Sequence, residues 1–186
     1  MADGFEAAGY GDVFAELLGE RRLNPLDGGA PNDAARRALE QLSVDSAFAG
    51  KPVTDASMAQ ACLSAAWLYH NFLDDSHTIS QGVETETGSF WHGIMHRREP
   101  DFRNSKYWFQ KVEQHPVFPG LAGEAVRIAG DTDLAATAGG AWDPFAYVDL
   151  CEAALSGEGP DLICREIQQR EFELLFDYSY LKAIGE

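Results

Sequence analysis

Residues 54–76 read TDASMAQACLSAAWLYHNFLDDS, and this stretch decides the fold class. Its apolar residues recur at intervals of three and four, which is the period of an α-helix with a buried face. Thr54 or Asp55 can cap the first turn with its side-chain oxygen. We therefore expect one long helix that runs from this cap to about Ser76.

The same period continues on both sides of this stretch, while the alternating pattern of β-strands is nearly absent. Asp143-Pro144 is a typical helix start, with an acidic cap and proline in the first turn. The other expected helices cover residues 13–18, 32–42, 89–98, 105–114, 121–129 and 160–180, and residues 130–140 form a loop rich in glycine and threonine. We predict an all-α fold, a single-domain bundle of six to eight helices over residues 1–186, in which residues 1–10 can be flexible.

The composition limits the partners and the location that we expect. A net charge of −16 would repel phosphate backbones and anionic lipid surfaces, so nucleic-acid and membrane partners are not expected. The first residues carry acids where a signal peptide needs bases, and no apolar run has the length of a membrane span. A cytoplasmic location is therefore the expectation. The 3 cysteines suggest neither a disulfide framework nor a zinc ribbon.

Residues with chemically active side chains are concentrated between positions 70 and 118. All 5 histidines lie there, together with two of the 4 tryptophans. Five basic residues, Arg97, Arg98, Arg103, Lys106 and Lys111, stand against only two acids over the same short stretch, although the whole chain is strongly acidic. A basic segment in an acidic protein is typical of an anion site or of internal carboxylate pairing.

This segment also carries a resemblance. The run FWHGIMHRREPD at 90–101, followed by NSKYWF at 104–109 and HPVF at 115–118, resembles a family of uncharacterised bacterial and fungal proteins. The upstream SHTISQ at 76–81 belongs to the same pattern. The resemblance covers about 45 residues strongly, and it implies no activity because none is known for the family.

The first hypothesis for the segment is a divalent metal site. His92 and His96 are one helical turn apart, which lets two imidazoles chelate one ion. Glu99 joins the same face if the helix extends that far. The preceding helix offers a second set at i, i+4 and i+7, formed by His70, Asp74 and His77. Gly93 stands where a zinc protease has its glutamate, and the Glu-x-x-His pairs of ferritin-like centres are missing.

The second hypothesis is a pocket for a small anionic or polar ligand, and it is the function that the sequence favours. Arg97 and Arg98 can bind a carboxylate or phosphate in a bidentate manner. Further ligand contacts are expected from Trp91, Asn104, Lys106, Tyr107 and Trp108. His77, His92 and His96 are the candidates for general acid–base catalysis.

The third hypothesis is a structural or interaction module in which the same polar residues satisfy one another inside the core. The apolar face formed by Phe172, Leu175, Phe176 and Tyr180 is then core or, as the alternative, a contact in a homodimer. The sequence has no Gly-x-Ser-x-Gly elbow, phosphate loop or dinucleotide fingerprint. The enzyme class and the substrate stay open at this point.

Overall fold

The computed structural model describes residues 5–130 and 140–186. Within these ranges the chain forms ten α-helices, one 3-10 helix and no strand, which confirms the all-α class and exceeds the expected six to eight helices. The 3-10 helix is η1 (Ala7–Tyr10), and the α-helices are α1 (Asp12–Leu18), α2 (Asp33–Glu40), α3 (Val44–Ala47), α4 (Ala56–Tyr69), α5 (Leu73–Ser80), α6 (Glu86–Arg98), α7 (Phe102–Phe109), α8 (Phe118–Ala129), α10 (Pro144–Leu155) and α11 (Asp161–Ile184).

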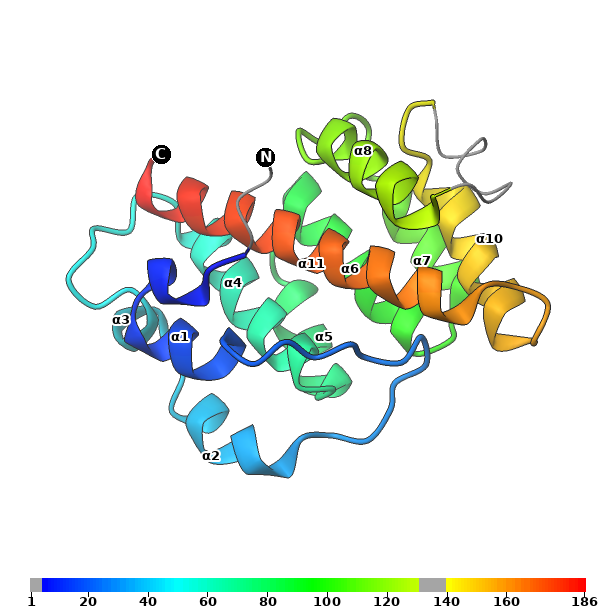
Figure 1. Cartoon of the computed structure of the whole chain (residues 1–186). Helices are drawn as coiled ribbons and strands as arrows, with labels where there is room; N and C mark the ends of the chain where they lie inside the picture. Colours follow the sequence, from blue (N-terminus) through cyan, green and yellow to red (C-terminus); the bar gives the residue numbers. More distant parts are fainter. Residues whose placement is uncertain (1–4, 131–139) are drawn as a thin grey trace.

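The long C-terminal helix α11 organises the molecule. It crosses the whole bundle in Figure 1 and packs against α4, α8 and α10. Its apolar face is core: Leu175 and Phe176 are fully buried, and the Phe176 ring meets that of Phe14 edge-on at a centroid distance of 5.0 Å. This face is therefore covered within the chain and is not available to a second copy.

The prediction of one long helix over residues 54–76 is wrong in one respect, because the chain forms two helices there, α4 and α5. Asp55 caps α4 as predicted, with its Oδ1 accepting from the backbone N–H of Ser57 and Met58. Asn71 adopts a left-handed conformation with φ of 64° and breaks the helix. The break is held in place because the backbone carbonyl of His70 accepts from the N–H of Asn32 and the side chain of Asn71 bonds to the carbonyl of Ala30 at 2.9 Å. Tertiary hydrogen bonds thus replace the helical ones.

Helix α6 lies inside the bundle, against α4, α5 and α7. Every residue from 87 to 98 is buried. The helix starts earlier than residue 89 because the Thr85 side chain accepts from the N–H of Gly88. At its middle, the carbonyl of Gly93 accepts a 2.7 Å hydrogen bond from Ser105 on α7. A helix that is buried on every side presents different faces to different neighbours. Side chains at successive positions of α6 therefore lie in different surroundings.

Other boundaries differ from expectation by a few residues. Helix α7 begins at Phe102 and not at residue 105, because the Asp101 side chain accepts from the N–H of Asn104 and starts the helix there. Helix α8 begins at Phe118, with Pro119 in its first turn. The predicted loop over 130–140 lies mostly outside the described residues. No helix in the described part of the chain is long and apolar enough to cross a lipid bilayer.

Candidate metal centre

Three histidines from two helices meet in one place. His77 comes from α5, and His92 and His96 come from successive turns of α6. One ring nitrogen of each lies within 4.8 Å of the corresponding nitrogen of the other two. His92 and His96 are 1% and 5% exposed, whereas His77 is only partly buried. The cluster is thus closed on the side of α6 and reaches toward solvent at His77.

Local sequence explains two of the three positions. His92 and His96 are four residues apart on α6, so their rings share a face, with centroids 4.7 Å apart. The third ring arrives because α5 packs against that face, which places His77 4.6 Å from His92 and 5.3 Å from His96 by ring centroids. The contact between α5 and α6 is therefore as important to the centre as the spacing within α6.

The buried rings of His92 and His96 are each oriented by a hydrogen bond at Nδ1. His92 Nδ1 lies 2.9 Å from Oγ of Ser80, whose hydroxyl also reaches the carbonyl of His77 at 3.3 Å. His96 Nδ1 lies 3.0 Å from Oε2 of Glu99, just past the end of α6. With the proton on Nδ1 in both rings, the lone pair is on Nε2. Such outer partners fix the tautomer and orientation of histidines that bind metals.

Asn104 on α7 completes the surroundings of His96. Its amide Nδ2 lies 3.0 Å from His96 Nε2. A carboxamide that turns by half a revolution exchanges Nδ2 for Oδ1, which brings an oxygen to the same place. Asn104 can therefore donate to the free imidazole and, after this turn, accept a hydrogen bond from water bound beside that nitrogen.

An aromatic residue covers the other side of the cluster. Trp108 packs on His92 with ring centroids 4.0 Å apart, and the Lys111 ammonium lies 3.8 Å from the centre of a Trp108 ring. The stack lies between His92 and solvent on the side of α7. It leaves the partly exposed His77 as the side from which water can approach.

The environment keeps the buried imidazoles uncharged. Burial, with smaller contributions from His96, His77 and Lys111, lowers the pKa of His92 to about 3. Burial also lowers the pKa of His96, against the opposing effect of its hydrogen bond to Glu99. Neutral imidazole is the form that binds a metal ion. These two rings are therefore in the binding form at neutral pH without having to lose a proton.

Several residues that the sequence placed in a metal site lie outside the cluster. Both ring nitrogens of His70 are engaged, with Nδ1 2.9 Å from the Asn32 amide and Nε2 2.8 Å from the carbonyl of Leu17. Asp74 is exposed on the first turn of α5. The expected i, i+4, i+7 set is wrong because the chain turns between α4 and α5. Within the described part of the chain, Glu99 contacts the centre through His96 alone.

The two arginines expected to bind a ligand point away from the histidines. Arg97 is buried and forms a bidentate ion pair with Glu171 of α11, with Nη1 3.2 Å from Oε1. Arg98 donates to the backbone carbonyls of Asp27 and Gly28, and its Nη2 donates to Oδ1 of Asn71 at 2.6 Å. The terminal nitrogens of Arg97 and the donors of Arg98 are thus used inside the fold, whereas the buried Nε of Arg97 has no hydrogen-bond partner among the described residues.

Of the remaining residues that were predicted to contact a ligand, two lie beside the histidines and three do not. Asn104 and Trp108 join the histidines, as described above. Trp91 is fully buried on another face of α6 and donates to Oγ of Ser179 at 3.1 Å. Lys106 pairs with Asp149 of α10, and Tyr107 is 51% exposed. Ser80 and Lys111 also lie beside the cluster, although neither was expected there from the sequence. Ser80 is three residues after His77, so the helical period could have placed it on the same face as that histidine.

The comparisons with known proteins add no relative: no family model, no curated protein and no solved structure matches the chain. The function is therefore inferred from the geometry of the cluster.

Proposed function

We propose that the protein binds one divalent transition-metal ion, with Zn²⁺ as the first candidate, through His77, His92 and His96. The observation that carries the proposal is the convergence of three ring nitrogens within 4.8 Å of one another. Imidazole nitrogen suits zinc, copper, nickel and iron, whereas magnesium and calcium prefer oxygen ligands.

The hydrogen bonds around the cluster support the same proposal. Ser80 and Glu99 each engage Nδ1 of a buried ring, which directs Nε2 of His92 and His96 to the ion. Nε2 of His96 faces the Asn104 amide, so Asn104 has to turn when the ion binds there. Glu99 bound to His96 repeats the carboxylate–histidine arrangement common at zinc sites. No described group bonds to either ring nitrogen of His77, so this ring is not committed to a structural contact.

We further propose an enzyme of the metal-assisted type, acting on a small polar or anionic substrate. Three protein ligands leave a fourth position of a tetrahedral ion open, and water bound there becomes a nucleophile near neutral pH. The partly exposed side of His77 is where water and substrate would enter. The proposal includes a cytoplasmic location, supported by cysteines that are all free and buried.

A purely structural role for the cluster is the alternative. Three imidazoles crowded together have a cost, because buried polar groups without partners destabilise a fold. Hydrogen bonds from described residues engage both ring nitrogens of His96 but only one of His92 and none of His77, so two of the three rings are incompletely satisfied as a structural network.

The test is metal content by inductively coupled plasma mass spectrometry on tag-free protein. We expect about one equivalent of a transition metal after dialysis against Zn²⁺, and its loss in His92→Ala. The matched control is His115→Gln, which changes a buried histidine outside the cluster. A His92→Ala protein that folds and retains the metal would contradict the proposal, as would wild-type protein that holds no metal after dialysis against Zn²⁺.

A further inference from the structure

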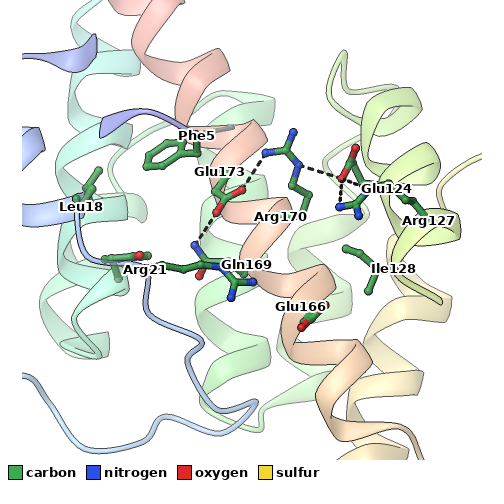
Figure 2. Close-up of a pocket in the computed structure, with 12 residues that line it drawn as sticks. Phe5, Leu18, Arg21, Glu124, Arg127, Ile128, Glu166, Gln169, Arg170 and Glu173 are labelled. Atoms are coloured by element: carbon green, nitrogen blue, oxygen red, sulfur yellow. Dashed lines mark hydrogen bonds and ion pairs between the residues drawn. The ribbon is translucent and has the colours of Figure 1, made fainter. Parts of the chain in front are cut away.

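A second concave site lies on another part of the molecule. A cavity of about 760 Å³ opens between the end of α1, helix α8 and the middle of α11, with Phe5 at its edge (Figure 2). Its volume is in the range of small-molecule sites. None of the metal-centre histidines lines it. It is therefore independent of the proposed metal centre.

Charged side chains of both signs line this cavity in equal number. Three of the 10 arginines of the chain are there, and three glutamates face them. They are Arg21, Arg127, Arg170, Glu124, Glu166 and Glu173. In a protein with a net charge of −16, this surface is locally neutral, so it neither repels an anion nor excludes a cation.

Part of this set is already organised. Arg170 lies between two carboxylates, with Nη1 2.9 Å from Glu173 and Nε 3.3 Å from Glu124. Arg127 pairs with Glu124 at 2.8 Å, and the Gln169 amide donates to Glu173 at 2.9 Å (Figure 2). Helices α8 and α11 are thus joined by ion pairs that give the cavity a fixed wall.

Two charges of the cavity stay without a direct partner. Arg21, in the segment after α1, forms no hydrogen bond or ion pair with any described residue. Glu166 on α11 likewise has no hydrogen bond or ion pair with a described residue, although its charge helps to raise the pKa of Arg127. One free guanidinium and one free carboxylate therefore line the same cavity, on different elements.

Apolar side chains line the remaining wall. Phe5, Leu18, Tyr69 and Ile128 border the cavity. Such a lining binds the body of a ligand, while a few charged groups fix its orientation.

We propose that this cavity binds a zwitterionic amino acid with a large apolar side chain. Arg21 receives the carboxylate, Glu166 receives the ammonium group, and the wall formed by Phe5 and Leu18 receives the side chain. A ligand with both charges satisfies both free groups and leaves the local charge unchanged, whereas a simple anion or cation satisfies only one.

The test is isothermal titration calorimetry of the full chain with three probes that share one phenethyl framework and differ in the charged groups attached to it. Phenylalanine carries both charges, 3-phenylpropanoate lacks the ammonium group and phenethylamine lacks the carboxylate. We expect phenylalanine to bind at least about tenfold more tightly than either analogue, because a hydrogen bond to a charged group has this effect or a larger one.

Two variants test whether Arg21 and Glu166 bind the charged groups of the ligand. Arg21→Gln is expected to weaken phenylalanine about tenfold and to leave phenethylamine unchanged, and Glu166→Gln is expected to weaken phenylalanine and to leave 3-phenylpropanoate unchanged. Arg37→Gln and Glu40→Gln, exposed on α2 outside the cavity, are matched controls that keep wild-type affinity. The proposal fails if phenylalanine shows no saturable binding at millimolar concentration, if an analogue binds as tightly, or if Arg21→Gln has no effect.

Discussion

The ring of Phe109 lies so close to the backbone of Gly93 that a side chain at position 93 would force the ring, between α6 and α7, to shift. A Cβ atom at position 93 would be 3.0 Å from Cε2 of Phe109 and 3.1 Å from two further ring atoms. This contact sets the distance between the helix that carries His92 and His96 and the helix that carries Asn104 and Trp108.

Gly93→Ala should therefore destabilise the protein by about 1–3 kcal/mol, the usual cost of overpacking a core. The measurement is urea unfolding. Gly123→Ala on α8 is the control, because its Cβ would meet no atom within 4 Å, and alanine in an open helical position stabilises by up to about 1 kcal/mol. Equal effects of the two substitutions would contradict the close contact between α6 and α7.

Glu99→Gln should weaken Zn²⁺ binding about 10–100-fold without unfolding the protein, the effect usual for a carboxylate that orients a metal-binding histidine. The reason is the 3.0 Å hydrogen bond to His96 Nδ1, which the neutral amide makes more weakly. Competition with a chromophoric chelator measures the affinity. Glu113→Gln, at an exposed position after α7, serves as control, and an equal loss there would show a general charge effect.

Breaking the ion pair between Arg97 and Glu171 should cost about 3–5 kcal/mol, because it leaves a buried charge without its partner. Glu171→Gln tests this by urea unfolding. Asp149→Asn breaks the more exposed pair with Lys106 and should cost no more than about 1 kcal/mol. Similar values for both variants would mean that Arg97 is not held as described and is free for another role.

His115 should make the fold less stable in mild acid. Its ring is buried beside Thr87 and Phe90, and burial lowers its pKa to about 4. The unfolded chain, with an ordinary histidine pKa of about 6.5, takes up the proton first. The stabilising effect of neutral His115 is complete above that value and is lost as the pH falls toward 4.

The slope from this residue approaches about 1.4 kcal/mol per pH unit between those limits. Free energies of unfolding measured at several pH values for the wild type and for His115→Gln should therefore converge as the pH falls from 7 to 4. Parallel curves for the two proteins would show that His115 does not carry this dependence.

Much of the fold is predictable because the signals are local. The three-and-four period identifies the helices, and the caps at Asp55 and Asp143 lie where the side chains of the sequence suggest. The break at Asn71 is not predictable in the same way. It depends on hydrogen bonds from Asn32 and to Ala30, which are some forty residues away in the chain.

What the sequence by itself determined is the all-α class and the pair formed by His92 and His96, since both follow from the geometry of a single helix. Only the tertiary structure decided which residues join them. The packing of α5 on α6 brings in His77 and Ser80, and the burial of α6 on every side turns Arg97 toward Glu171 and away from the histidines. The physical reason is that neighbours on one helix are set by a fixed rotation per residue, whereas neighbours across helices depend on how side chains far apart in sequence fill the core.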